Sequence, residues 1–191
     1  MEGLKKSYFY KVGTFLFALI IFLASSLWAR EALIKNIVVT TSQKNLLVYF
    51  TVANCFTKEM ERAILNGVPV TFTYKIVLEE KRTLFPDKTI ASLILHHTLK
   101  YDQLKEVFII TRQGKAKDHL TSKDLIWAKK IMAEVEVPVV SLAKLKKGHK
   151  YTLRLKAELS KVKLPFYLRY ILFFSSLWNF KTNWYSVEFV Y

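Results

Sequence analysis

The side chains best suited to catalysis or metal binding lie in two pairs of adjacent residues, His96-His97 and Glu79-Glu80. Both pairs lie in stretches that alternate apolar and polar residues, a pattern that predicts β-strands. Neighbours on a strand face opposite sides of the sheet, so the imidazoles cannot share a metal ion and the carboxylates diverge. We therefore expect no metal site here. His97 falls on the apolar side and is predicted to be a structural residue that hydrogen-bonds a neighbour.

Other catalytic or cofactor patterns are missing from the sequence. No serine lies in the glycine-flanked elbow of a hydrolase, and five glycines in the whole chain leave no phosphate-binding loop. We expect a protein that is not an enzyme, with no catalytic residue and no cofactor.

A basic stretch between residues 141 and 163 has two interpretations. Its side chains could form an anion-binding stripe, or its lysines could protect an exposed strand from pairing with another edge. The sequence favours the protective role, because charge on one strand is easily solvated. The residues of the anion-binding alternative are Lys146, Lys147, Lys150, Arg154 and Lys156.

An aromatic stretch follows, and Arg169 in its middle makes it too interrupted to span a bilayer. Aromatic side chains of this kind could lie among lipid head groups, where tryptophan and tyrosine are enriched. A lid over the core is the favoured interpretation, because aromatic residues dominate core burial. The candidate interfacial aromatics are Tyr167, Tyr170, Trp178 and Trp184.

The elements that must position these residues are mostly strands. Alternation predicts strands over 33–41, 46–53, 70–79, 91–101, 106–112, 151–159 and 184–191. Thr57 can cap a short helix, and a second helix is expected to start near Thr121 and Asp124, include Val135, and end at Pro138. The pattern predicts a mainly β protein, an antiparallel β-sandwich of general immunoglobulin-like architecture, with two or three short helices in its connections.

The N-terminus carries a different signal. Residues 12–29 are uncharged and apolar and follow Lys5, Lys6 and Lys11, an order typical of export. Their length lies between a cleavable signal peptide and a membrane-spanning helix. We expect residues 1–29 to be a signal peptide or an N-terminal anchor helix, and residues 30–191 to form one exported domain.

Charge and cysteine content describe that exported part. The formal net charge is +15, and the leader contributes three lysines and one glutamate, so +13 remains. This excess suggests an anionic partner or a lysine-rich solubilising surface, and export argues against nucleic acid. Cys55 is the single cysteine, lies in an apolar stretch and is predicted to be a buried, unreactive thiol.

Several segments resemble a bacterial family, domain of unknown function 4390. The segment 62–72, RAILNGVPVTF, is similar to the family pattern EAL-x-x-GVPL-x-F, whereas Leu84-Phe85 stand where members commonly have tryptophan. The resemblance implies an exported envelope protein. The family has no established activity, so the resemblance assigns no functional residues. Its other marks are Arg82, residues 95–104, Leu164-Pro165 with Leu168 and Arg169, Trp178 and Trp184.

We expect a non-enzymatic binding module of the cell envelope that faces the periplasm and binds a protein or another envelope component. The alternative is a peripheral binder of anionic lipid or polymer that uses the basic and aromatic residues, and the third is an unrecognised envelope enzyme. The protein would be soluble in the periplasm after cleavage, or tethered to the inner membrane through residues 12–29.

Overall fold

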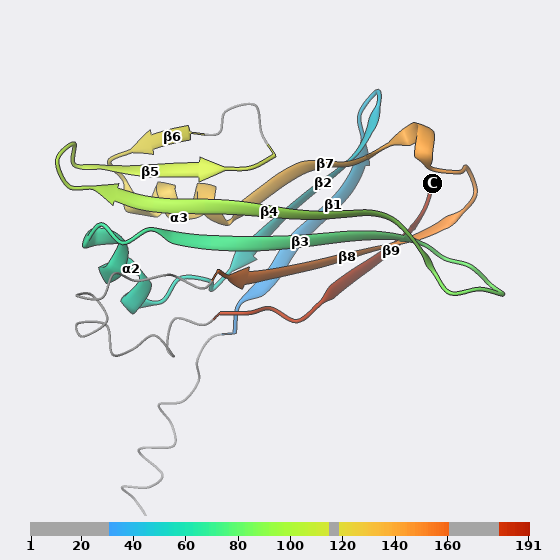
Figure 1. Cartoon of the computed structure of the whole chain (residues 1–191), viewed down its shortest axis with the longest axis horizontal. Coiled ribbons are helices and arrows are strands. Elements are labelled where there is room, and N and C mark those ends of the chain that lie inside the picture. The colour runs from blue at the N-terminus through green and yellow to red at the C-terminus, as the bar shows by residue number, and fades with distance from the viewer. Residues whose placement is uncertain (1–30, 115–118, 161–179) are drawn as a thin grey trace, which may run out of the picture. The chain divides into compact units, whose positions relative to one another are not determined.

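The computed structural model describes residues 31–114, 119–160 and 180–191, and this part of the chain is mainly β (Figure 1). Residues 31–191 cluster as one compact unit. The predicted apolar helix at 12–29 lies outside the described residues. Among the residues described, no helix is both long and apolar enough to cross a bilayer.

The strands form two antiparallel sheets. The three-stranded sheet has the order β1-β2-β7 and the six-stranded sheet the order β6-β5-β4-β3-β8-β9. The first contains β1 (Leu33–Thr41), β2 (Asn45–Ala53) and β7 (Glu134–Ser141). The second contains β3 (Val70–Glu80), β4 (Lys88–Asp102), β5 (Val107–Arg112), β6 (His119–Ser122), β8 (Lys150–Leu159) and β9 (Tyr185–Val190).

The central strands follow the predicted alternation. On β3 the even-numbered residues from Val70 to Leu78 are fully buried, and on β8 the odd-numbered residues from Tyr151 to Ala157 are too. The two strands pair directly, with Ile76 opposite Leu155. Because β3 and β8 share one buried face, they form the apolar centre of the six-stranded sheet.

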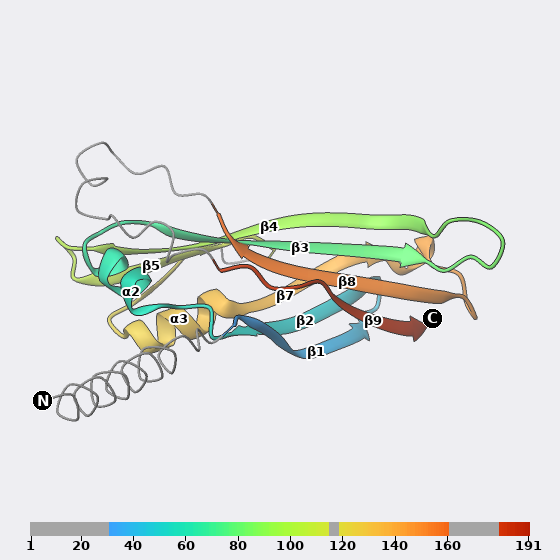
Figure 2. The same cartoon turned by 90° about the horizontal axis from the view of Figure 1, so that it is seen from below.

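The described part of this unit also contains two short α-helices, which Figure 2 shows near one another. Helix α2 (Lys58–Leu65) starts at Thr57, whose side-chain oxygen accepts a hydrogen bond from the Met60 amide at 3.2 Å, as the sequence predicts. Helix α3 (Leu125–Ala133) starts at Asp124, whose carboxylate accepts from the Ile126 amide at 2.8 Å. A 3₁₀ turn, η1 (Leu142–Lys144), follows β7.

The end of the second helix was predicted wrongly. Residues 134–141 form β7 rather than a continuation of the helix, and Val135 is buried on that strand opposite Phe50. Pro138 lies within β7, at the edge of its sheet, where a residue without an N–H interrupts no inner ladder. Proline therefore marked an edge strand here and not a helix end.

Candidate functional site

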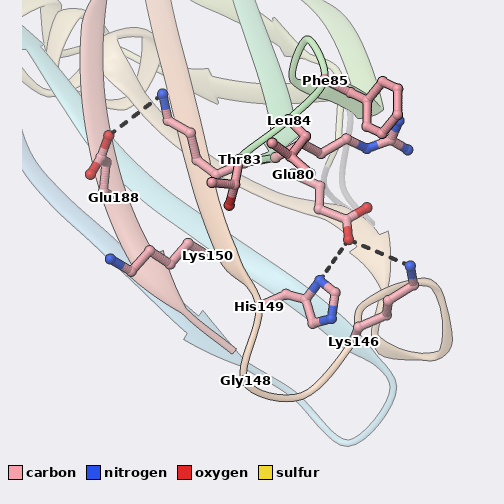
Figure 3. Close-up of a pocket in the computed structure, with 11 residues that line it drawn as sticks. Glu80, Thr83, Leu84, Phe85, Lys146, Gly148, His149, Lys150 and Glu188 are labelled. Atoms are coloured by element: carbon pink, nitrogen blue, oxygen red, sulfur yellow. Dashed lines mark hydrogen bonds and ion pairs between the residues drawn. The ribbon is translucent and has the colours of Figure 1, made fainter.

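A cleft of about 820 Å³ lies at one end of the six-stranded sheet. Its walls are the β3–β4 connection, the segment that leads into β8, and β9 (Figure 3). Figure 1 shows that the first two connections lie at the same end of the sheet. Four lining side chains are cationic (Lys81, Arg82, Lys146 and Lys150), and two are carboxylates (Glu80 and Glu188).

Backbone pairing holds these walls together. The Lys81 amide donates to the Lys150 carbonyl at 2.9 Å and so extends the β3–β8 ladder beyond Glu80. In the turn before β8, the His149 amide donates to the Lys146 carbonyl, and Gly148 has a φ of +77°. Such a turn favours glycine because L side chains are strained at positive φ. The Tyr151 hydroxyl accepts from the Lys146 amide at 2.8 Å and fixes the start of the turn.

Glu80 is the acidic centre of the cleft. Only 5% of the residue is exposed, and its Oε1 accepts a hydrogen bond from His149 Nδ1 at 2.7 Å and lies 3.5 Å from Lys146 Nζ. Figure 3 shows the His149 ring and the Lys146 side chain directed at this carboxylate. Burial alone would raise the pKa of Glu80, but the His149 hydrogen bond and the Lys146 charge outweigh it and lower the pKa. Glu80 is therefore ionised at neutral pH.

Lys81, on the wall formed by the β3–β4 connection, pairs with two other acidic side chains. Lys81 Nζ lies 3.1 Å from Asp87 and 3.9 Å from Glu188 of β9. The hydrogen bond to Asp87 raises the pKa of Lys81, and the same bond lowers the pKa of Asp87. Both ion pairs are partly exposed, so they orient the hairpin more than they stabilise it.

Two cations of the cleft have no acidic partner among the residues that the structure describes. Neither Arg82 nor Lys150 forms an ion pair with a described residue. Lys150 is exposed and points away from Glu80 (Figure 3). These two side chains are free to bind an anion without first breaking a contact within the described part of the chain.

Apolar side chains stand beside these cations. Leu84 is 86% exposed and Phe85 is 69% exposed, and both line the cleft from the β3–β4 connection. A single exposed apolar side chain is common on a protein surface. Two adjacent ones form an apolar patch, and such patches often mark a binding site. We refer to residues 81–87 as the hairpin tip.

The structure divides the predicted basic stripe into two parts. Lys146 and Lys150 line the cleft, and Lys147 is exposed in the turn between them. Arg154 and Lys156 lie further along β8. Arg154 pairs with Glu79 at 3.7 Å and Lys156 with Glu158 at 3.4 Å, and both lie over the Trp184 ring. These two cations already have partners and do not line the cleft, so they add no free positive charge to it.

The predicted protective role of the lysines on β8 is wrong. β8 lies between β3 and β9 within the six-stranded sheet, so it presents no free edge to protect. Of the aromatic candidates, Trp184 is 40% exposed and stacks on the β8 cations. Tyr167, Tyr170 and Trp178 lie outside the described residues.

The hairpin tip is the part of the cleft that sequence reasoning missed. Lys81, Leu84 and Phe85 were not predicted as site residues, because alternation stops at Glu80 and the following residues fit a plain turn. A signal was present in the sequence, since Leu84-Phe85 come one residue after Lys81-Arg82 in a segment that joins two apolar strands.

The remaining candidates behave as structural residues. His97 is buried and its Nδ1 donates to the Met132 carbonyl at 2.9 Å, whereas His96 on the other face contacts Thr73, as the strand geometry predicts. Burial lowers the pKa of His97 to about 4. Cys55 is buried as predicted, and burial raises its pKa to about 12. Within the described part of the chain, no three metal-ligating side chains converge.

Comparison with known protein families identifies the family of this chain. The family model described as Domain of unknown function (DUF4390) matches residues 29–188. The chain belongs to this family. The match covers almost the whole compact unit of residues 31–191, so the cleft lies inside the family domain. No curated protein and no solved structure matches the chain.

Proposed function

We propose that this DUF4390 protein is an exported, non-enzymatic binding module of the cell envelope, and that its cleft binds the head groups of anionic lipids. One observation carries the proposal: Arg82 and Lys150, which form no ion pair with any residue in the described ranges, lie in the same cleft as the exposed Leu84 and Phe85. A membrane surface offers both matching features, anionic head groups and an apolar layer just beneath them.

The apolar residues favour lipid over a purely anionic polymer. A polyanion would pair with the cations but leave Leu84 and Phe85 in water. At a bilayer, the hairpin tip can place these two side chains among the acyl chains while Arg82 and Lys150 remain at head-group level. An acidic envelope protein with an apolar patch is the competing partner, and the test below separates the two.

Export and location are part of the proposal. The apolar run at 12–29 behind three lysines supports transfer of residues 30–191 to the periplasm, either cleaved or tethered to the inner membrane. A protein in that position meets lipid surfaces and not nucleic acid. We also propose that the two sheets pack as a β-sandwich, because their buried side chains belong to one core cluster.

The test compares two double variants of the full chain. Arg82→Gln/Lys150→Gln removes the unpaired cations of the cleft, and Lys35→Gln/Lys100→Gln removes the same charge from exposed sites outside it. Binding to vesicles of phosphatidylcholine, with and without phosphatidylglycerol, is measured by flotation. Each basic residue at an anionic surface contributes about 1 kcal/mol, so the cleft variant should bind anionic vesicles about 30-fold more weakly.

The control variant should bind like the wild type, and the difference should disappear at about 0.5 M salt, where screening is nearly complete. The leader is common to every variant, so its own affinity for vesicles cancels in the comparison. Equal binding by both double variants would refute the lipid proposal and favour a protein partner for the cleft.

A further inference from the structure

A second site of a different kind surrounds Arg112, at the end of β5. Arg112 follows Phe108 and Ile110 on the buried face of its strand, and only 7% of it is exposed. Its Nε has no hydrogen-bond partner in the part of the chain that the structure describes. A guanidinium keeps its charge in a protein, and buried polar atoms are nearly always hydrogen-bonded. A buried arginine with an unpaired nitrogen therefore calls for an explanation.

Arg112 lines a cavity of about 220 Å³ that it shares with the three-stranded sheet. Tyr49 and Thr51 of β2 contribute to the lining, as do their partners on β7, Glu136 and Glu134. The volume is below the range typical of pockets for drug-sized molecules, so the cavity suits a small group. None of its lining residues belongs to the cleft.

An irregularity in β1 shapes the same cavity. The register of β1 against β2 shifts between Lys35 and Val38, and Asn36 within this bulge has a φ of +54°. Its amide nitrogen donates to Thr51 Oγ1 at 3.2 Å. Bulges redirect side chains and are common beside functional sites. Here the bulge brings a carboxamide to the cavity that contains the buried guanidinium.

We propose that this cavity binds a small carboxylate, with Arg112 as its principal partner. A guanidinium matches a carboxylate in shape and charge, and Asn36 and Tyr49 supply further hydrogen-bond donors. Glu134 and Glu136 line the cavity too, so a group with one negative charge fits better than a doubly charged phosphate. The carboxylate can come from a free small acid or from the C-terminus of a peptide.

The test follows the Nε–Hε signal of Arg112 in a ¹H–¹⁵N spectrum of the full chain in a zwitterionic detergent. The signal is assigned by its loss in Arg112→Lys. Sodium acetate should shift it with saturation, and sodium chloride at the same ionic strength should not. A tripeptide with a free C-terminus, compared with its amidated form, distinguishes the two sources of carboxylate. A shift that sodium chloride reproduces, or no shift with either carboxylate, overturns the proposal.

Two exposed asparagines offer a matched pair of variants that keep the fold. Asn36 and Asn54 both have positive φ, which glycine adopts without strain, but only Asn36 lines this cavity. Asn36→Gly should weaken acetate binding several-fold, and Asn54→Gly should leave it unchanged. Equal affinity in both variants would remove the bulge from the site, and equal weakening would attribute the effect to the backbone and refute a direct role for Asn36.

Discussion

His97 is a buried base that packs edge-on against Tyr74 and hydrogen-bonds the Met132 carbonyl. Its pKa falls from 6.5 to about 4 on folding, chiefly through burial and in part through the charge of Arg112. The folded state therefore binds fewer protons than the unfolded state between these values, and stability must fall as the pH falls through this window. The free energy of unfolding should be about 2 kcal/mol lower at pH 5 than at pH 7.5.

Urea denaturation at the two pH values measures this difference. A His97→Gln variant lacks the titrating group and should lose most of the pH dependence, even if it is less stable throughout. A variant with the wild-type slope would show that another group is responsible.

Cys55 gives a second prediction for a single residue. Its Sγ contacts the Val52 carbonyl at 3.3 Å inside the core, and burial raises its pKa to about 12. The thiolate is the reactive form, so the native protein should resist a thiol reagent such as iodoacetamide at pH 8. Denaturant should restore the reactivity of an ordinary cysteine. Rapid labelling of the native protein would contradict the buried position.

For single residues, alternation along a strand predicts well which side chains are buried and which are exposed. Alternation placed His97 inside and His96 outside, because adjacent residues on a strand have opposite faces. It did not predict Arg112 as buried, although Arg112 continues the pattern of Phe108 and Ile110. A charged residue at a strand end is normally exposed, and local alternation does not show that Arg112 lies beside a cavity shared with β2 and β7.

Among the elements, the turn before β8 positions the cleft. Gly148 has a φ of +77°, and an added Cβ would meet no atom within 4 Å, so any penalty for a side chain there is conformational. Gly148→Ala should lower the free energy of unfolding by about 1 kcal/mol and weaken vesicle binding by moving Lys150. Gly148→Asn should cost less, because asparagine adopts positive φ more readily. Equal stability of all three proteins, measured by thermal denaturation, would refute this role of the turn.

The elements also show why most strands, but not all, could be predicted from the sequence. The strands at 70–79 and 151–159 were predicted from long one-sided alternation, which a central pair of strands requires. β7 was missed because Pro138 and the preceding helical pattern gave a consistent but wrong alternative. Its pairing with β2 is a contact between residues about 90 positions apart, which local patterns do not encode.

For the molecule as a whole, the cleft depends on arrangement more than on composition. The excess of positive charge was evident in the sequence, but its division between paired and unpaired cations was not. Arg154 and Lys156 contact carboxylates and Trp184, whereas Arg82 and Lys150 have no ion-pair partner among the described residues. The hairpin tip joins two strands, and the turn before β8 comes about 60 residues later. Only the β3–β8 pairing brings them together.

The most direct test of lipid binding places a polarity-sensitive dye on the hairpin tip. Leu84→Cys can be labelled selectively because Cys55 is buried, and Lys100→Cys at the other end of β4 serves as the control. With the full chain reconstituted in vesicles at low salt, the dye at residue 84 should shift to the blue when phosphatidylglycerol is present and revert at about 0.5 M salt. The dye at residue 100 should not respond. A dye at residue 84 that reports water in every vesicle would contradict the proposed contact between the cleft and the bilayer.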